Sequence, residues 1–479
     1  MKTYRNFRKN GSVTMIIFKL HRRLIGFCFL TLLFHMCGRA EMLVKPYLQN
    51  LTDSTIVVMW KTSDSLPGAV QYGLDTSYGQ IVEQNDSSIY HEILLTSLVL
   101  DTVYHYRVIS GTDTTQDYSF HTPVLSAKPF CFVVIGDTRT DSSAHQSVVD
   151  RILTIQPPPN FVIQTGDLTE YGSDSLYQVY FSIEEGLLAY STQFPCVGNH
   201  DLNNMTNWFS FFALPHNERW YTFYYGNSAF HCLDNYSSYE PSTPQYEWFL
   251  NALLADSANP DIRHIFVFFH EPPYTTSLGH SSNLIIREHL CPLFERFNVR
   301  LTFQGHVHAY EHSLVNDVHY IISGGGGAPL HYEWDLPQSW TMYRESAYEF
   351  VLVEVRGDTI VSQGIKPNGE IFDTFSIIAP QVSVEKTDKS LTKNSTMLKV
   401  FPSVFINSTC ISFSVFSPMH VELAIYNSSG QKLEVLSKEN MRVGQCKIFY
   451  EPEFMPDGIY FCVLKTPDFT YTVPFVKIK

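Results

Sequence analysis

Five short apolar runs in the central part of the chain each end in a cluster of polar side chains. The runs begin at Phe130, Phe161, Phe194, His264 and Leu301. A short run rich in Val, Ile and Phe is typical of a strand that is buried on both faces. Groups that follow the C-terminal ends of neighbouring strands meet in one crevice of an open α/β sheet. The pattern therefore predicts a central α/β domain with a polar site at one edge.

Segments with the apolar spacing of a helix lie between these runs. They cover residues 142–156, 245–255 and 283–297. In the first segment the spacing places Val148, Val149, Ile152 and Leu153 on one helical face.

The regions on either side of this domain have the pattern of β structure. Residues 41–124 hold short strands at 55–61, 68–72 and 102–109, separated by Gly, Asp and Ser turns. Trp60 on an early strand fits the core of a β-sandwich. The polar segment 381–396 is typical of a linker, and the short strands after it predict a second, smaller β-sandwich over 397–479.

The first forty residues have the pattern of a secretory signal peptide. They contain eight Lys or Arg and no acid, with an apolar segment from Leu24 to Phe34 and small residues at Gly38 and Ala40. The apolar segment is too short for a comfortable membrane span. We therefore expect cleavage after residue 40, a secreted or cell-surface protein, and no stable membrane span.

The acidic balance of the chain argues against nucleic-acid partners. The formal charge is −14, and removal of the eight basic residues of the signal segment leaves 25 basic against 47 acidic residues, a net charge of −22. A surface of this sign repels a phosphate backbone. The expected partner is a small molecule rather than a polynucleotide.

The polar clusters contain the donors of a metal site. They supply two Asp, one Asn and three His as candidate ligands: Asp137, Asp167, Asn199, His270, His306 and His308. Carboxylate, amide and imidazole groups are ligands that divalent metals accept. A single Gly-Asp pair is more often a turn, and a single His after a buried strand is more often structural. The full ordered set is hard to obtain by chance, so the sequence predicts a metal-dependent hydrolase.

The order Gly-Asp, Gly-Asp, Gly-Asn-His-Asp, His, Gly-His-x-His resembles the calcineurin-like metallophosphoesterase superfamily over residues 128–380. The resemblance implies two sheets flanked by helices and two metal ions, whose identity (Fe, Zn or Mn) stays open. Such a pair activates a water for in-line attack on a phosphate ester. With Asp167 as the bridge, the implied ligands are Asp137, Asp167 and His308 for the first metal, and Asp167, Asn199, His270 and His306 for the second.

Two further segments resemble purple acid phosphatases within this superfamily. They are Gly305–Glu311, around the last metal motif, and the glycine-rich turn Ser323–Leu330. His280, ten residues after His270, occupies the place of a His that protonates the leaving group in such enzymes. Residues 41–124 resemble the fibronectin type III-like domain that precedes their catalytic domain. The resemblance implies a phosphomonoesterase.

The chain departs from the purple acid phosphatase pattern beside the bridging residue. The family has a Tyr three places after that Asp, and this Tyr binds ferric iron and gives the colour. Here Glu170 holds that place and Tyr171 comes one place later. We therefore expect a colourless protein, with Glu170 and Tyr171 as alternative further ligands of the first metal.

Three more residues are candidates for contact with the phosphate. His200 resembles the superfamily His that contacts the scissile phosphate, and Asp201 is expected to orient it. Arg139 cannot bind a cation, but its guanidinium fork suits a phosphate. Together with His280 they make up the predicted catalytic set.

The C-terminal β region resembles the type IX secretion sorting domain of Bacteroidetes-like bacteria. The likeness rests on Ala424-Ile-Tyr-Asn-x-x-Gly430, Gly458-Ile-Tyr-Phe461 and the closing segment Val476–Lys479. It implies the type IX machinery as a partner and export across a bacterial outer membrane. An accessory domain that binds a polymer or a protein is the alternative.

Two other functions stay open. The Gly166-Asp-Leu-Thr-x-x-Gly172 run looks more like a phosphodiesterase branch of the superfamily. A non-catalytic surface protein could keep the same scaffold for binding, although all six ligand positions are occupied in this chain.

Overall fold

The structure is a computed structural model in which two compact units, Met1–Gln381 and Val382–Lys479, can be distinguished. It describes residues 41–126, 128–379, 398–401, 404–405, 408–415, 419–427, 430–441, 444–452, 455–466 and 470–477. The predicted signal segment 1–40 and the predicted linker 381–396 lie outside the described residues.

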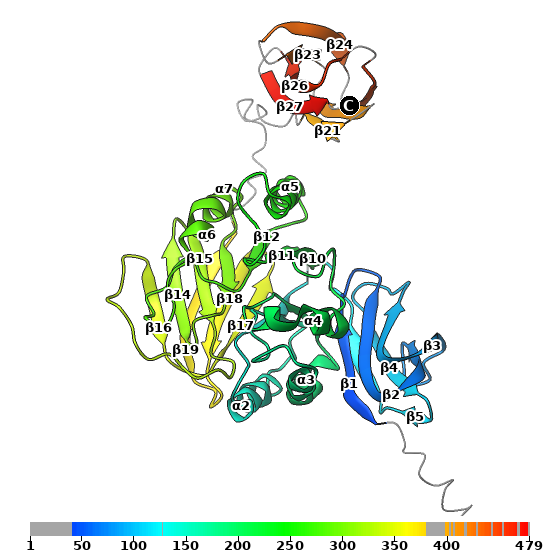
Figure 1. Ribbon diagram of the computed structural model, residues 1–479, viewed down its shortest axis with the longest axis vertical. Helices are drawn as coiled ribbons and strands as arrows, with labels where there is room; N and C mark the ends of the chain where they lie inside the picture. The colour runs from blue at the N-terminus through cyan, green and yellow to red at the C-terminus, as the bar shows by residue number, and fades with distance from the viewer. Residues whose placement is uncertain are drawn as a thin grey trace, which may run out of the picture. The chain divides into compact units, whose positions relative to one another are not determined.

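The N-terminal domain is a six-stranded, antiparallel arrangement in which β2 pairs with β1, β3 and β4 (blue in Figure 1). Inward-facing residues such as Trp60 and Tyr106 are fully buried and form its core. The strands are β1 (Met42–Gln49), β2 (Ile56–Gly73), β3 (Gln80–Leu95), β4 (Val103–Ser110), β5 (Asp113–Thr114) and β6 (Tyr118–His121).

One strand of this domain differs from the prediction. The sequence indicated separate strands at 55–61 and 68–72, but both belong to the single long strand β2. The register between β2 and β3 shifts between Lys61 and Leu66 and again between Leu66 and Gly68. Irregular pairing of this kind takes up the extra residues and bends the strand. The polar stretch between the two halves is therefore a bulge within one strand, not a turn.

Two sheets form the central domain. In the first, the order is β19-β18-β17-β7-β8-β9, with β7, β8 and β9 parallel. In the second, the order is β10-β11-β12-β13-β15-β14-β16, with β11, β12, β13 and β15 parallel. The strands are β7 (Phe130–Ile135), β8 (Phe161–Gln164), β9 (Thr192–Pro195), β10 (Tyr221–Tyr225), β11 (Ser228–Cys232), β12 (His264–Phe268), β13 (Leu301–Gln304), β14 (Tyr310–Val315), β15 (Val318–Ser323), β16 (Thr341–Glu345), β17 (Phe350–Arg356), β18 (Thr359–Ile365) and β19 (Ile371–Ile378).

Aromatic side chains join the two sheets face to face. Phe132 on β7 makes edge contacts with Phe230, Phe266 and Phe303 on three strands of the other sheet, at centroid distances of 5.3, 5.5 and 6.0 Å. Every residue of β7 is buried. This explains the uninterrupted apolar runs, because strands covered on both faces have no solvent-facing side to carry polar residues.

Helices cover these sheets, and two of the predicted helices end differently from expectation. The helices are α2 (Ser142–Ile152), α3 (Asp174–Leu188), the short 3₁₀ helix η1 (Asp201–Asn204), α4 (Met205–Phe211), α5 (Pro244–Ala258), α6 (Leu284–His289) and α7 (Cys291–Arg296). The predicted helix 142–156 ends at Ile152, so Leu153 lies just after α2, where it is 44% exposed. The predicted helix 283–297 is divided into α6 and α7, because Pro292 starts a new helix and cannot donate to the previous turn.

The N-terminal domain packs against both ends of α3 and the end of α4 in the central domain. The Tyr47 hydroxyl donates to the Phe211 carbonyl at 2.7 Å, and the Tyr106 hydroxyl donates to the Ala189 carbonyl at 2.8 Å. Buried Lys61 forms an ion pair with Asp174 at the start of α3. The domain therefore supports the helices next to the site rather than the site itself.

The C-terminal unit is also rich in β structure. Its strands form a sheet in the order β20-β22-β25 and another in the order β21-β27-β26-β23-β24, with buried residues such as Phe413, Leu423 and Phe475 in the core. The strands are β20 (Lys399–Phe401), β21 (Val404–Phe405), β22 (Thr409–Val415), β23 (Met419–Asn427), β24 (Lys432–Met441), β25 (Gly444–Tyr450), β26 (Gly458–Lys465) and β27 (Thr470–Lys477). Within the part of the chain that the structure describes, no helix is both long and apolar enough to cross a membrane.

Candidate metal centre

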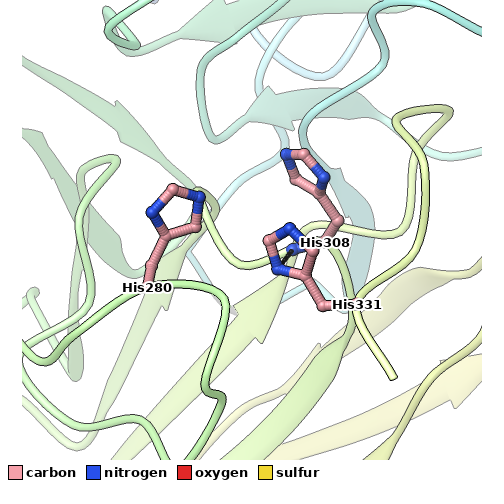
Figure 2. Close-up of side chains that lie close together, drawn as sticks. All are labelled: His280, His308 and His331. Atoms are coloured by element: carbon pink, nitrogen blue, oxygen red, sulfur yellow. Dashed lines mark hydrogen bonds between the residues drawn. The ribbon is translucent and has the colours of Figure 1, made fainter. Parts of the chain in front are cut away.

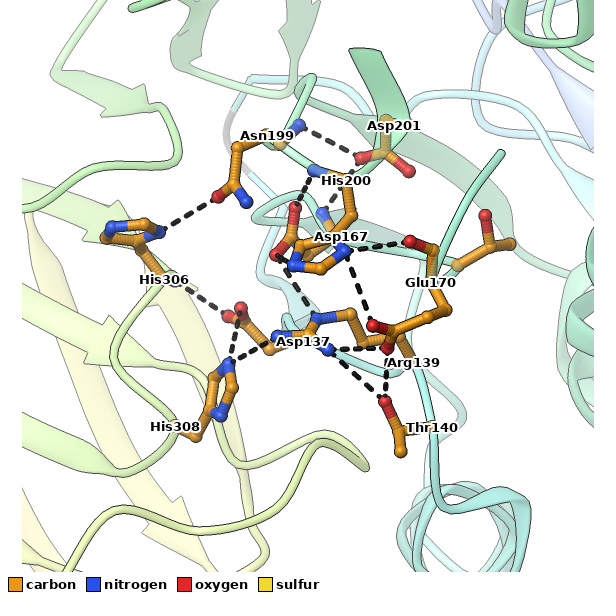
Figure 3. Close-up of polar contacts among 12 residues, drawn as sticks. Asp137, Arg139, Thr140, Asp167, Glu170, Asn199, His200, Asp201, His306 and His308 are labelled. Carbon is orange, nitrogen blue, oxygen red and sulfur yellow. Dashed lines mark hydrogen bonds and ion pairs between the residues drawn. The ribbon is translucent and has the colours of Figure 1, made fainter. Parts of the chain in front are cut away.

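The loops that follow β7, β8, β9, β12 and β13 converge at one edge of the two sheets (Figure 3). Direct contacts connect the predicted ligands to one another across these loops. The structure therefore brings together all six predicted ligands: Asp137, Asp167, Asn199, His270, His306 and His308.

The backbone at three of these ligands adopts an uncommon conformation. Asp137, Asp167 and His306 have φ angles of +53°, +55° and +70°. Left-handed conformations are unfavourable for residues with a side chain, and they cluster at functional sites where the surrounding structure holds them. The strand-end loops are thus shaped to aim these side chains at a common point.

The glycines of the motifs allow the ligands to approach so closely. A Cβ atom at position 198 would lie 2.2 Å from Asp167 Oδ1, and one at position 305 would lie 2.5 Å from Asp137 Oδ2. The glycine-rich turn after β15 is also closely packed, since a Cβ at Gly324 would lie 2.1 Å from the Val307 carbonyl oxygen. These glycines therefore belong to the site because they leave space for the carboxylates.

The proposed second metal position is lined by an amide and two imidazoles. Asn199 Oδ1 lies 3.2 Å from His270 Nε2 and 3.1 Å from His306 Nδ1. His270 Nδ1 donates to the Thr165 carbonyl at 2.7 Å, which leaves the lone pair of Nε2 directed at the site. Asp167 Oδ1 lies 3.5 Å from the same Nε2 atom. This donor set fits a divalent metal.

The proposed first metal position has a free carboxylate oxygen. Asp137 Oδ1 is buried without a hydrogen-bond partner among the described residues, and it lies 3.7 Å from His308 Nε2. His308 Nδ1 donates to the Pro329 carbonyl at 2.8 Å, so its Nε2 also presents a lone pair. Ligand atoms of Asp137, Asp167 and His270 lie within 4.8 Å of one another. Both positions therefore fit the ions that the sequence predicts.

The electrostatics of the site favour a cation. Burial, and then the nearby Asp167 carboxylate, raise the pKa of Asp137 well above its usual value. Burial and the neighbouring imidazoles lower the pKa of His306 to about 2 and that of His308 to about 3. Neutral imidazoles keep their lone pairs, and crowded carboxylates are relieved by a bound cation.

Arg139 lies beside the first position. Its Nε is 3.4 Å from Asp167 Oδ2, its Nη1 donates to Glu170 Oε2 at 2.5 Å, and its Nη2 is 3.3 Å from His308 Nε2. Burial opposes ionisation of Glu170, but hydrogen bonds from Thr140 and Arg139 outweigh it and lower the pKa of that carboxyl. Glu170 is therefore the charged partner of a guanidinium.

The alternative ligand, Tyr171, is exposed and lines the same pocket as Arg139 and Glu170. Its side chain is 64% exposed, whereas the six predicted ligands lie in the buried or half-buried centre. A tyrosinate ligand must reach the metal directly. Of the two residues, Glu170 is the one that contacts Arg139 beside the first position. The expectation of a colourless or pale protein stays a prediction.

The structure gives Asp201 a different role from the predicted one. Its carboxylate accepts from the backbone N–H groups of Gly198, Asp167 and Leu168, at 2.9, 2.8 and 3.2 Å. The ring of His200 is instead held through Nδ1, which is 2.8 Å from the Glu170 carbonyl oxygen. The expectation that Asp201 orients His200 is therefore not met. Asp201 holds the two ligand-bearing loops together, because an acceptor-only carboxylate satisfies their buried N–H groups.

His280 reaches the centre as predicted, and two further side chains lie there that the sequence reasoning missed. The His280 ring is 3.8 Å from that of His306, centroid to centroid. His331 stacks on His308 at 4.3 Å, and the Tyr236 hydroxyl lies 3.4 Å from Asn199 Oδ1. Neither of these two belongs to a metal motif, so no sequence signal placed them in the site.

A pocket of about 810 Å³ adjoins the first position. Four polar residues line the pocket next to the metal centre: Arg139, Glu170, His308 and His331. Apolar side chains such as Leu176 line it between α2 and α3. A pocket with a few polar groups at one end and an apolar wall suits a small organic molecule.

Comparison with known proteins agrees with this geometry. Residues 131–310 match the family model of calcineurin-like phosphoesterases, and residues 43–122 match that of the purple acid phosphatase N-terminal domain. The central domain is therefore similar to calcineurin-like phosphoesterases. The first model covers the five strand-end motifs, and the second covers most of the N-terminal β domain.

Several curated proteins that the chain resembles are plant phosphatases. The probable purple acid phosphatase 20 of Arabidopsis thaliana is 26% identical over 290 residues, which is 53% of this chain and 65% of the relative. A phosphoenolpyruvate phosphatase of Allium cepa is 25% identical over 268 residues, 51% of this chain and 55% of the relative. The chain thus spans between half and two thirds of the length of these two proteins. Another relative is an Fe(3+)-Zn(2+) purple acid phosphatase of Arabidopsis thaliana, 24% identical over 57% of this chain and 67% of the relative.

Solved structures show the same fold. A purple acid phosphatase from yellow lupin (Lupinus luteus) seeds has a TM-score of 0.62 at 18% identity and covers 70% of this chain and 74% of its own. PhoD has a TM-score of 0.57 at 11% identity and covers 71% of this chain and 91% of its own. The matches support the prediction of a metal-dependent phosphoric ester hydrolase with a dinuclear centre.

Proposed function

We propose that the protein is a secreted phosphoesterase that hydrolyses phosphate monoesters at a dinuclear metal centre. The observation that carries the proposal is the convergence of all six predicted ligands, in which a carboxylate oxygen of Asp167 lies within 4.8 Å of ligand atoms of both Asp137 and His270. A divalent pair supplies an activated water and charge stabilisation for the phosphoryl oxygens.

The side chains around the metals have separate tasks in this proposal. Arg139, in the lining of the pocket, provides the fixed positive charge for the phosphate. His200 binds the phosphate beside Asp167, whose Oδ2 lies 3.8 Å from His200 Nε2. His280 supplies the proton to the leaving alcohol, since it packs against His306 at the edge of the centre. The organic part of the ester would occupy the pocket next to the first position.

We also propose the cellular route that the sequence pattern indicates. Residues 1–40 would act as a signal peptide, residues 41–124 as a fibronectin type III-like support domain, and residues 397–479 as a type IX sorting domain. The β-rich fold of the C-terminal unit is compatible with that last role. Expression in a host with and without type IX export, followed by fractionation, tests it; retention of the full chain inside the cell in both hosts would contradict it.

The catalytic proposal is tested with the purified full chain and added Zn, Mn or Fe. We expect release of nitrophenol from nitrophenyl phosphate, and loss of that activity after chelation. A folded protein that is inactive on simple esters with every metal would disprove the proposal.

A phosphodiesterase of the same superfamily is the second candidate. The Gly166–Gly172 run favours it, because this run looks more like the phosphodiesterase branch of the superfamily. Rates on mono- and bis-nitrophenyl phosphate at equal concentration distinguish the two. A faster rate on the diester would reverse our preference.

The remaining alternative is a binding protein that has kept the scaffold without catalysis. This alternative predicts that at least one of the two metal positions binds no ion. Two ions per chain by elemental analysis, together with turnover, support the enzyme; one ion or none, without turnover, supports the binding protein.

A further inference from the structure

One more histidine, His331, belongs to the centre although no motif contains it. Its ring stacks on that of His308, with centroids 4.3 Å apart and an angle of 23° between the planes, and it lies 5.3 Å from the ring of His280. One nitrogen of each ring lies within 4.8 Å of the others. Figure 2 shows the three imidazoles grouped around one space.

The main chain fixes His331 at this place. Its N–H donates to the His308 carbonyl at 2.9 Å. An isolated β-bridge between Ser277 and Trp334 joins its loop to the loop that carries His280. The position of the ring is therefore set by backbone contacts on two sides, as a built site requires.

A hydrogen bond also sets which ring nitrogen carries the proton. The backbone N–H of His308 donates to His331 Nδ1 at 3.3 Å. Because a backbone N–H can only donate, Nδ1 must be the unprotonated nitrogen, and the neutral ring carries its hydrogen on Nε2. His331 thus offers a hydrogen-bond donor on the side away from this contact.

Gly279 provides the space for the ring. A Cβ atom at this position would lie 2.4 Å from Nδ1 and 2.7 Å from Cε1 of His331. These distances are far below van der Waals contact, so any other residue at 279 would push the imidazole out of its slot. The glycine and the histidine form one unit.

We propose that His331 is a further phosphate-binding residue, which donates from Nε2–H to a phosphoryl oxygen beside His280. A ring nitrogen of His331 lies within 4.8 Å of one of His280. Two N–H donors at such a separation can reach two oxygens of the same phosphate, because each N–H···O bond is about 2.9 Å long. Arg139 Nη2 lies 3.3 Å from His308 Nε2 on the same side of the centre. An anion suits a space next to a guanidinium, whereas a further metal ion there would be repelled. The inference deepens the proposed function and rests on it.

Binding of inorganic phosphate to the metal-loaded full chain, measured by calorimetry, tests this without relying on turnover. For His331→Ala we expect about tenfold weaker binding, the effect of one hydrogen bond to a charged group. The metal content should be unchanged. With nitrophenyl phosphate, the KM should rise more than the kcat falls.

Two isosteric variants sharpen the test. The amide nitrogen of Gln can occupy the place of Nε2, while Asn reaches only the place of Nδ1. We expect His331→Gln to keep most of the phosphate affinity and His331→Asn to behave like His331→Ala. Gly279→Ala should show the same loss, and the double variant Gly279→Ala/His331→Ala should lose no more than either one. Tyr332→Ala, at an exposed neighbouring side chain, is the matched control and should bind phosphate normally.

The results separate this inference from the catalytic proposal. Wild-type phosphate affinity in both His331→Ala and His331→Asn would overturn it, and so would loss of a metal ion from His331→Ala, which would make His331 a ligand. If the wild-type protein binds metals and phosphate but hydrolyses no ester, the proposed function fails, while the variants still decide the role of His331.

Discussion

The two halves of the metal centre share Asp167 but differ in their surroundings. The second position is made of neutral donors, with Asn199 Oδ1 at 3.1–3.2 Å from the nitrogens of His270 and His306. At the first position, the ion pair of Arg139 with Glu170 lies beside the carboxylate of Asp167. The second position therefore offers its donors to a metal ion alone, whereas the first position already contains the fixed positive charge of Arg139.

This difference indicates unequal metal affinities. An ion in the second position meets lone pairs that are held in place, as with His270 through its bond to the Thr165 carbonyl. An ion in the first position competes for Asp167 with a guanidinium whose Nε is 3.4 Å away. Like charges at such distances repel appreciably in a partly buried site. We expect the second position to bind its metal more tightly than the first.

The largest effect should come from the residue that the two halves share. Asp167→Asn removes half of the bridging charge, and we expect turnover to fall by about three orders of magnitude, equivalent to several kcal/mol. The fold should persist, as judged by circular dichroism and thermal unfolding. Turnover like that of the wild type would show that the bridge is assigned wrongly.

Metal titration of the chelated protein tests the inequality directly. We expect one tight and one weaker metal-binding event in the wild type. Calorimetry measures the two affinities, and elemental analysis measures the number of bound ions. His306→Ala should weaken the tight event by at least about 100-fold, beyond the usual effect of changing an outer-shell partner. Its matched partner His308→Ala should weaken only the second event. Two equal events, or loss of the same event in both variants, would contradict the comparison.

Arg139 should affect phosphate binding rather than the metals. For Arg139→Ala we expect about tenfold weaker binding of phosphate with both ions retained, because a charge-assisted fork is lost. Arg139→Lys keeps the charge but not the fork, and should recover only part of the affinity. Loss of metal from Arg139→Ala would instead make this residue a structural part of the first position.

A smaller effect concerns Glu349, which supports the glycine turn next to the first position. Burial raises the pKa of Glu349 to about 8, and its carboxyl accepts from the Gly325 N–H at 3.1 Å. Since the folded pKa lies above the unfolded value of 4.5, the folded state binds more protons between these values, and stability falls as pH rises through this window. The Glu349→Gln variant has no carboxyl to ionise at this position, so it should not lose this stability. The difference in melting temperature, variant minus wild type, should therefore increase from pH 5 to pH 8. A constant difference across this range would disprove the assignment.

The smallest expected effect is that of Tyr171→Phe. Tyr171 is 64% exposed, and we expect Glu170 rather than Tyr171 beside the first position, so the variant should keep its metals, activity and absorption spectrum. We expect the iron-loaded wild type to be colourless or pale. An intense visible band that disappears in the variant would restore a tyrosinate ligand and overturn the comparison as drawn.

The sequence alone predicted the order of the ligands and the strands that carry them. Asp137 and Asp167 could be found because each follows a run of residues that must be buried on both faces, and this pattern is local. The helix over 283–297 was placed in the right segment but not divided, because the effect of Pro292 depends on where the preceding turn ends. Likewise, the bulge in β2 depends on pairing with β3, which a single strand does not encode.

Only the tertiary structure decided which side chains meet around those ligands. The structure shows Asp201 as an acceptor for three backbone N–H groups, not as a partner of His200. It also shows His331 packed against Gly279, which lies 52 residues earlier in the chain. Contacts of this kind follow from how loops of different strands pack in three dimensions. Residue type and periodicity indicate burial and the local path of the chain, so they predict which side chains follow each strand. The packing of the loops decides which other side chains those residues contact.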